Sequence, residues 1–285
     1  MSAPVSITQN GRTAMLKWHR ARRCLSDPVF TGRRVIEAMT VGASIEVDLV
    51  VTGDNGFAVL HNLELSEETT GSGLVSELGD DALRQLYLRD NTGAPTDQPV
   101  MLLGDLCRLM AAGSIHSDAL LQLDYKQDET VLNDAAIRNF REATAPVASN
   151  LILSSGSARA VDLLAGLGET TDNPSQKPRI GYDPCSEETI TALQQTADYR
   201  GFVDTALATS PDAEMIYLAW QLVIELDREG FDVIGAFHDA GRRVDAWTIR
   251  TVNDDTRPII ERLLELRVDQ ITTDDPQGVA SAFAI

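Results

Sequence analysis

Eight short apolar runs rich in valine, isoleucine and leucine recur along the chain, and stretches with helical periodicity separate many of them. This alternation predicts parallel strand pairing, because parallel strands need a long crossover that is usually a helix. Eight such units in 285 residues predict an α/β fold, a closed TIM (β/α)8 barrel, for which roughly 250 residues is typical. An open doubly wound sheet is the alternative, but no G-x-G-x-x-G motif follows the first run. The runs are AMLKWH (14–19), SIEVDLV (44–50), ALLQLDY (119–125), NLILSS (150–155), RIGYD (179–183), EMIYLA (214–219), RVDAWTI (243–249) and DQITTD (269–274).

Helical patterns between the runs support this organisation. They follow Thr31, Thr130, Ser186 and Phe231, and a further one has a candidate N-cap at Asp254 or Asp255. Residues 62–100 contain no clear strand and are rich in Gly, Thr, Asp and Glu, which predicts an insertion after the second strand, either a functional lid or a surface segment. We expect a single barrel domain over residues 1–285.

The charge balance excludes several kinds of partner. Lys and Arg number 24 against 43 Asp and Glu, a formal net charge of -19, which disfavours binding to nucleic acid or to an anionic membrane face. The three cysteines form no C-x-x-C motif, and no run of 18 apolar residues or N-terminal leader pattern is present. We therefore expect a cytoplasmic protein without a membrane anchor. The oligomeric state is not readable from the sequence.

Carboxylates at the ends of neighbouring strands indicate a cation site. Glu46 and Asp48 share one face of the second strand, because strand side chains alternate, and Asp124 with Lys126 repeats this spacing at the end of the third. Carboxylates without nearby cysteines suit a hard cation, Mg²⁺ or Ca²⁺. The alternative is a buried ion network in which the acids pair with Arg20 and Lys126.

The four histidines divide by position. His19 closes the first strand and His61 follows the second, where an imidazole can transfer protons near neutral pH or simply form a structural hydrogen bond. His116 lies in a polar loop and His238 in a helix, and we expect structural roles for both. Trp247 lies on the seventh strand as a core residue or a substrate platform.

Seven motifs in order resemble those of the glycerophosphodiester phosphodiesterase family, over essentially the whole chain. They are HR (19–20), IEVD (45–48), VLHN (59–62), TTGSG (69–73), LDYK (123–126), AWTI (246–249) and ITTDDP (271–276). The step from His19 to Glu46 and the step from Asp48 to His61 are also similar to those of the family.

The resemblance implies a TIM barrel with a small insertion after the second strand. It also implies a divalent metal, Mg²⁺ or Ca²⁺, held by Glu46, Asp48 and Asp124, with His19 and His61 as the acid–base pair. Arg20, Lys126 and Trp247 would bind phosphate or substrate. The implied reaction is hydrolysis of a small hydroxyl-bearing phosphodiester to a phosphomonoester and an alcohol, through a cyclic phosphate.

Several positions depart from the family pattern. Ala21 replaces the Gly after HR, VFT (29–31) replaces E-N-T, Asn62 replaces the Asp of H-D, and Asp124 replaces a Glu. These changes leave the choice between a glycerophosphodiester and a sugar phosphodiester, such as an agrocinopine-like opine, open. Two further hypotheses are a barrel that binds a phosphorylated ligand without turnover and an aldolase-like enzyme with a Schiff base on Lys126.

Overall fold

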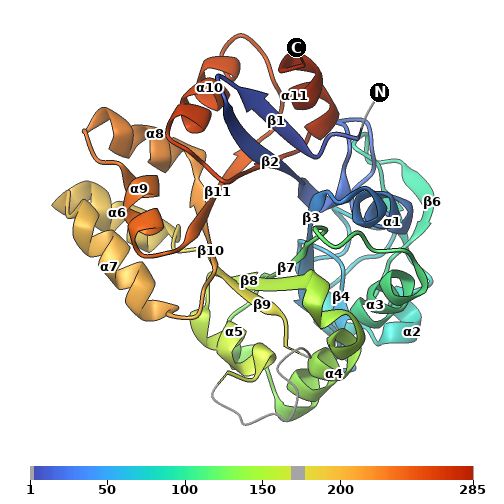
Figure 1. Cartoon of the computed structure of the whole chain (residues 1–285). Helices are drawn as coiled ribbons and strands as arrows, with labels where there is room; N and C mark the ends of the chain where they lie inside the picture. Colours follow the sequence, from blue (N-terminus) through green and yellow to red (C-terminus); the bar gives the residue numbers. More distant parts are fainter. Residues whose placement is uncertain (1–2, 168–176, 285) are drawn as a thin grey trace.

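The chain forms a closed barrel of parallel strands surrounded by helices, as the computed structural model of the whole chain shows (Figure 1). The structure describes residues 3–167 and 177–284. Within these ranges eight parallel strands form the barrel, and β2 pairs with both β12 and β3, which closes the sheet. All eight apolar runs overlap barrel strands, and the predicted TIM (β/α)8 barrel is confirmed. The barrel strands are β2 (Arg12–Trp18), β3 (Ser44–Val51), β7 (Leu121–Tyr125), β8 (Leu151–Ser155), β9 (Arg179–Tyr182), β10 (Met215–Ala219), β11 (Arg243–Ile249) and β12 (Gln270–Thr273).

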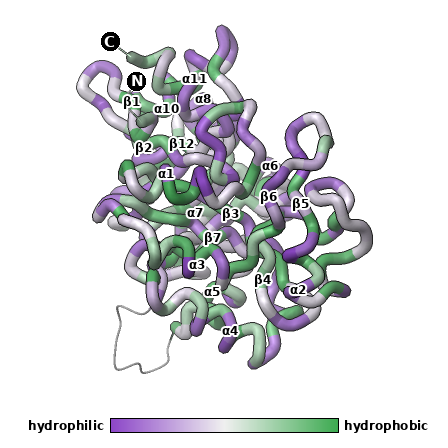
Figure 2. Tube along the Cα trace, turned by 90° about the vertical axis from the view of Figure 1, so that its right-hand side faces the viewer, coloured by the Kyte–Doolittle hydropathy of each residue, from purple (hydrophilic) through white to green (hydrophobic). Residues whose placement is uncertain are grey.

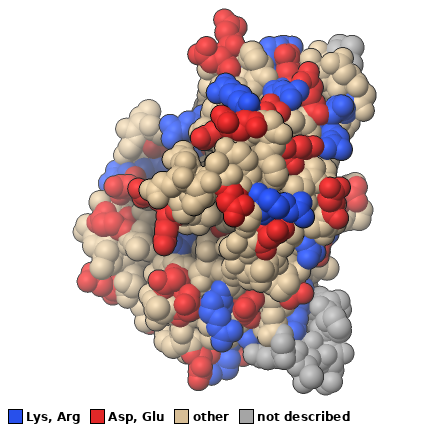
Figure 3. Space-filling view, turned by 90° about the vertical axis from the view of Figure 1, so that its left-hand side faces the viewer, with Lys and Arg blue, Asp and Glu red and all other residues tan. Residues whose placement is uncertain are grey.

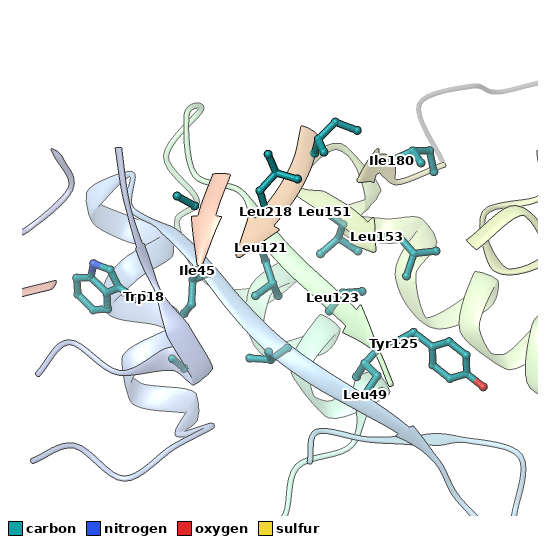
Figure 4. Packing of buried hydrophobic residues seen from close by; sticks show 14 of the residues in the cluster. Trp18, Ile45, Leu49, Leu121, Leu123, Tyr125, Leu151, Leu153, Ile180 and Leu218 are labelled. Carbon is teal, nitrogen blue, oxygen red and sulfur yellow. The ribbon is translucent and has the colours of Figure 1, made fainter. Parts of the chain in front are cut away.

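Strand β3 shows how the barrel sorts its side chains. All its residues are buried, although apolar and acidic positions alternate along it. Figure 4 shows Ile45 and Leu49 packed among the apolar side chains of neighbouring strands. Glu46 and Asp48 occupy the alternate positions and therefore face the opposite side, toward the barrel interior. The two-residue period of the strand thus places apolar residues under the helices and acids inside the barrel.

Helices follow the barrel strands and cover their outer face. The helices predicted after Thr31, Ser186 and Phe231 are observed as α1, α6 and α9, and the Ser186 side chain caps α6 through the Thr189 N–H. The main helices are α1 (Gly32–Val41), α3 (Leu103–Ala112), α4 (Asp134–Thr144), α5 (Ala158–Ala165), α6 (Glu187–Thr196), α7 (Tyr199–Thr209), α8 (Trp220–Arg228), α9 (Val233–Asp239), α10 (Arg257–Glu265) and α11 (Pro276–Ala282).

Two predicted helix starts were wrong. Helix α10 begins after Thr256 rather than at Asp254 or Asp255, and no side chain caps it. Helix α4 begins at Asp134, where Asn133 accepts hydrogen bonds from two backbone N–H groups, and only a short 3₁₀ turn precedes it. In both cases a later residue starts the helix, because several polar residues in succession offer the sequence equivalent capping positions.

The segment between β3 and β7 contains more regular structure than its composition suggests. It includes β4 (Phe57–Ala58), η2 (Val75–Glu77), α2 (Asp80–Leu83) and an antiparallel pair, β5 (Tyr87–Arg89) with β6 (Pro95–Pro99). The expectation that residues 62–100 contain no strand was therefore wrong. Figure 2 shows β5 and β6 close to β4 and α2, with hydrophilic and hydrophobic residues intermixed. These strands are short, and β6 has proline at both ends, so they lack the apolar alternation that reveals a strand in sequence.

The termini and surface add three features. An unpredicted strand, β1 (Ser6–Gln9), forms a hairpin with β2 through Asn10 and Gly11, both with positive φ. Figure 3 shows acidic and basic side chains scattered over one face rather than gathered in a single patch. None of the described helices has the length and apolar character needed to cross a bilayer.

Candidate active site

The predicted site residues gather at the carboxyl ends of the barrel strands, around a cavity of about 540 Å³. The residues that line it come from several strands and the loops that follow them, as expected for a barrel of this kind. Asp48 is the one predicted residue outside the lining, and it is fully buried. The predicted residues in the lining are His19, Arg20, Glu46, His61, Asp124, Lys126 and Trp247.

Strand register brings the three carboxylates together. Asp48 lies directly opposite Asp124 on the parallel neighbour β7, and Glu46 is two residues before Asp48 on the same face. One oxygen from each of Glu46, Asp48 and Asp124 lies within 4.8 Å of the others. Both Asp48 oxygens are buried without a hydrogen bond of normal geometry. Buried carboxylates so close together are stable only when cations offset their charge or a proton neutralises one of them.

Two basic side chains supply part of the positive charge that offsets these carboxylates. Arg20 Nε lies 3.2 Å from Asp48 Oδ2, and Lys126 Nζ lies 2.8 Å from Asp48 Oδ1 and also pairs with Asp124. Burial opposes the charged form of Lys126, but Asp124 and Asp48 together raise its pKa. The ion network expected as the alternative to a metal is thus present, yet three carboxylates against two cations leave one negative charge. Burial, followed by repulsion from Asp48, raises the pKa of Glu46 well above its usual value.

The residues present fit a hard divalent cation. The cluster consists of carboxylate oxygens alone, it carries an excess negative charge when all three groups are ionised, and the Asp48 oxygens still have capacity for a ligand. Mg²⁺ and Ca²⁺ prefer such oxygen ligands. Glu46, Asp48 and Asp124 would hold the ion, with Lys126 and Arg20 at its edge.

A left-handed turn after β2 positions Arg20. Within η1 (His19–Ala21), Arg20 has φ 53 and Ala21 has φ 58. The turn directs the Arg20 N–H to Glu46 Oε2, 2.8 Å away, while the guanidinium reaches Asp48. The family pattern has glycine at position 21, which adopts this conformation without strain. Ala21 nevertheless adopts it here, with φ 58.

His19 forms a hydrogen-bonded pair with Asp274, a residue that was not predicted to belong to the site. His19 Nδ1 lies 2.5 Å from Asp274 Oδ1, and His19 Nε2 lies 3.9 Å from Glu46 Oε2. Burial lowers the pKa of His19, although Asp274 opposes this. Burial would raise the pKa of Asp274, but His19 and Arg22 together hold it below its usual value. The motif ITTDDP contains Asp274 and could have revealed it, because this motif ends the last strand, which pairs with the first.

His61 lies in the loop after β4 and lines the same cavity. Its Nδ1 lies 2.8 Å from Asn62 Oδ1, and Glu68 accepts hydrogen bonds from the backbone N–H groups of both residues at 2.9 Å. An amide at position 62 can therefore hold the ring by accepting from Nδ1–H, which leaves Nε2 available. His116 and His238 lie outside this cavity and pair with Asp118 and Asp269.

A buried polar chain below the cluster was also missed in the sequence. Lys17 Nζ lies 3.1 Å from Asp245 Oδ2 and contacts the Gln122 amide. Gln122 donates to Ser154 Oγ at 2.8 Å, and Ser154 donates to Asp124 Oδ1 at 2.6 Å. Residues two positions apart on a strand share a face, which is how Glu46 and Asp48 were paired in the sequence. The same rule places Lys17 on the face of His19 and Gln122 on the face of Asp124, so it could have identified Lys17 and Gln122.

A family model and several solved structures match this chain. The model of the glycerophosphoryl diester phosphodiesterase family matches residues 34–278. A phosphodiesterase from Oleispira antarctica, solved with the product sn-glycerol-3-phosphate, is 19% identical with a TM-score of 0.66 and 98% of each chain covered. Glycerophosphodiester phosphodiesterases from Agrobacterium tumefaciens and Thermotoga maritima are each 17% identical with TM-scores of 0.63; the match covers 94% of this chain and 99% and 98% of theirs. No curated protein matches the chain.

Proposed function

The chain belongs to the glycerophosphoryl diester phosphodiesterase family of phosphoric diester hydrolases, and from this premise we propose which bond it cleaves and how. The substrate is a small phosphodiester with a hydroxyl next to the phosphoester, and the products are a phosphomonoester and an alcohol. The sn-glycerol-3-phosphate held by the Oleispira antarctica structure is a product of this type. The observation that carries the proposal is the convergence of two histidines and a cluster of three carboxylates, two of them in the lining of the same cavity and the third, Asp48, buried beside them.

The reaction depends on a divalent cation, Mg²⁺ or Ca²⁺, held by Glu46, Asp48 and Asp124. When bound, such an ion offsets charge on the phosphoryl oxygens and polarises the phosphorus centre. Arg20 and Lys126 add positive charge beside the cluster, where they can stabilise the same oxygens as negative charge grows. In a chain with a net charge of -19, the charge of the ion together with these two side chains is needed to hold an anionic substrate.

His19 and His61 act as the acid–base pair. Asp274 orients the His19 ring through Nδ1, so Nε2 exchanges protons with the substrate, and Asn62 has the corresponding role for His61. One histidine accepts the proton of the substrate hydroxyl while the hydroxyl oxygen attacks phosphorus. The other donates a proton to the alcohol oxygen as its bond to phosphorus breaks. Water then opens the cyclic phosphate, and the histidines exchange roles.

The test measures phosphomonoester release from glycerophosphodiesters with Mg²⁺ or Ca²⁺ and after chelation. We expect activity only with metal, a loss of at least about 10²-fold in His19→Ala and His61→Ala, and wild-type activity in the control His238→Ala. A diester that lacks the neighbouring hydroxyl should not be cleaved. Full activity in chelator would contradict the metal assignment, and no release from any diester would support a barrel that only binds ligand.

The Schiff-base hypothesis is disfavoured by the surroundings of Lys126. Its ammonium pairs with Asp48 and Asp124, which raise its pKa, whereas a Schiff-base lysine needs a lowered one. Borohydride should therefore trap no carbonyl compound on Lys126.

A further inference from the structure

The cavity has two walls with different hydrogen-bonding character. On the wall formed by β2, β3, β7 and β12, the polar side chains are largely paired with one another. Asp48 pairs with Arg20 and Lys126, Asp124 with Lys126, and Asp274 pairs with His19 and Arg22. This is the wall that the proposed function assigns to the phosphoryl group.

The opposite wall comes from three consecutive βα units and presents polar groups without protein partners. Gln221 from the first turn of α8 and Arg250 after β11 form no side-chain hydrogen bond or ion pair among the residues described, and the Tyr217 hydroxyl forms none either. Asp183 after β9 accepts from the Cys185 N–H at 2.8 Å and pairs with no cation in the described parts of the chain. One cavity face thus offers a carboxyl acceptor, an amide, a hydroxyl and a guanidinium to a ligand.

Tyr217 occupies a prepared position on this wall. A Cβ at Gly181 would lie 2.5 Å from Tyr217 Cε2, so glycine at this position lets the ring come this close to β9. Lys17 Nζ lies 4.2 Å from the ring centroid. The close contact with Gly181 and the Lys17 ammonium together hold the Tyr217 ring, and so fix the direction of its hydroxyl.

The chemistry of this wall selects among possible alcohols. An acyl chain is excluded, because nearly every lining residue is polar. A quaternary ammonium is opposed by two positive charges, those of Lys17, which already lies over the Tyr217 ring, and of Arg250, so the Trp247 face is the one aromatic surface of this lining left to it. An anionic alcohol would be attracted by Arg250, but it is opposed by the net charge of -19 and by the ionised form of Asp183, whose pKa burial raises to about 7. A neutral alcohol with several hydroxyls can use donors and acceptors together.

We propose that Asp183, Tyr217, Gln221 and Arg250 bind the alcohol half of the diester, and that this alcohol is a neutral polyol such as a cyclitol or sugar. Trp247 lies on β11, close in sequence to Arg250, and supplies an apolar surface for the carbon face of the polyol ring. A cavity of about 540 Å³ accommodates a phosphodiester with such a ring. This inference rests on the proposed function, because it assigns the part of the substrate that leaves.

The experiment compares kcat/KM for glycerophosphoinositol, which carries a polyol, with kcat/KM for glycerophosphocholine, which carries a cation. Wild type should prefer the inositol diester by about tenfold or more, the equivalent of one hydrogen bond to a charged group. Arg250→Met and Gln221→Leu change exposed side chains, so the barrel should fold normally, with an unchanged Tm. Each should lower kcat/KM for the inositol diester several-fold, about the value of one hydrogen bond, and neither should lower kcat/KM for the choline diester to the same extent. Arg250→Met should raise the choline value, because it removes a positive charge that opposes the cation.

Arg228→Met is the matched control, because Arg228 is an exposed arginine on α8 outside this cavity. It should leave both kcat/KM values unchanged. Equal or faster cleavage of the choline diester, or equal losses on both substrates in the two wall variants, would overturn the polyol assignment while hydrolysis itself stands. Failure of wild type to cleave either diester with metal present would instead remove the proposed function, and this inference with it.

Discussion

Replacing Asp274 with asparagine tests whether Asp274 orients the His19 imidazole and stabilises its protonated form. Asparagine keeps the shape of the side chain and can still accept from Nδ1–H, but it removes the negative charge 2.5 Å from the ring. An imidazolium that forms during proton transfer then loses its counter-ion. Because Asp274 also pairs with Arg22, the guanidinium loses a partner as well.

The size of the effect follows from the kind of bond that is lost. A hydrogen bond to a charged group contributes about 1.5–3 kcal/mol, and about 1.36 kcal/mol corresponds to a factor of ten in rate. We therefore expect Asp274→Asn to lower kcat by about 10- to 150-fold, with KM nearly unchanged, because the interaction strengthens only when the ring is charged. The assay is steady-state release of phosphomonoester from a diester that wild type cleaves, at saturating metal.

The chain contains its own matched control. His238 Nε2 lies 2.8 Å from Asp269 Oδ2, a second His–Asp pair that involves the residue before β12 and lies outside the cavity. Asp269→Asn should leave kcat within about twofold of wild type, because the same chemical change is made away from the substrate. A kcat for Asp274→Asn within about threefold of wild type, with the fold intact by circular dichroism, would refute the orienting role of the pair.

Two further variants test positioning and stability. Ser154→Ala removes the 2.6 Å hydrogen bond to Asp124 Oδ1 and should weaken Mg²⁺ or Ca²⁺ binding about tenfold or more by calorimetry; unchanged affinity would contradict this role. Burial would raise the pKa of Asp27, but hydrogen bonds, first from Arg34, hold this pKa below its usual value. The ionised Asp27 therefore stabilises the folded protein above the usual pKa of an aspartate, and this stabilisation is lost as pH falls through the lowered pKa. Asp27→Asn should therefore lower the free energy of unfolding by about 2 kcal/mol at pH 7 and by much less near pH 2 in urea titrations; an equal loss at both pH values would exclude the ionic origin.

Much of the fold was predictable because its signals are local. A strand exposes one side chain to each face in turn, so the alternation of Ile45 and Leu49 with Glu46 and Asp48 predicts which residues point inward before any partner is known. The carboxyl ends of parallel strands meet at one end of a barrel, which is why Asp124 and His19 could be assigned to the same site. Short elements without such periodicity, β5 and β6, were missed for the same reason.

The polar partners of the site were less accessible, because they depend on strand register and on closure. His19 and Asp274 are 255 positions apart and meet only because β12 pairs with β2 to close the barrel. Ser154 reaches Asp124 because β8 pairs with β7 in a register that places the two residues opposite each other. A shift of one residue in either pairing would turn these side chains to the other face.

The sequence by itself determined the barrel, its order of strands and the acids and histidines offered to the site, because these follow from local periodicity and motif order. The tertiary structure alone decided which charge faces which: Asp274 behind His19, Arg20 and Lys126 on Asp48, and the wall of Asp183 and Arg250. The physical reason is that electrostatic and hydrogen-bond energies depend on distances between strands remote in sequence, and only the closed barrel sets those distances.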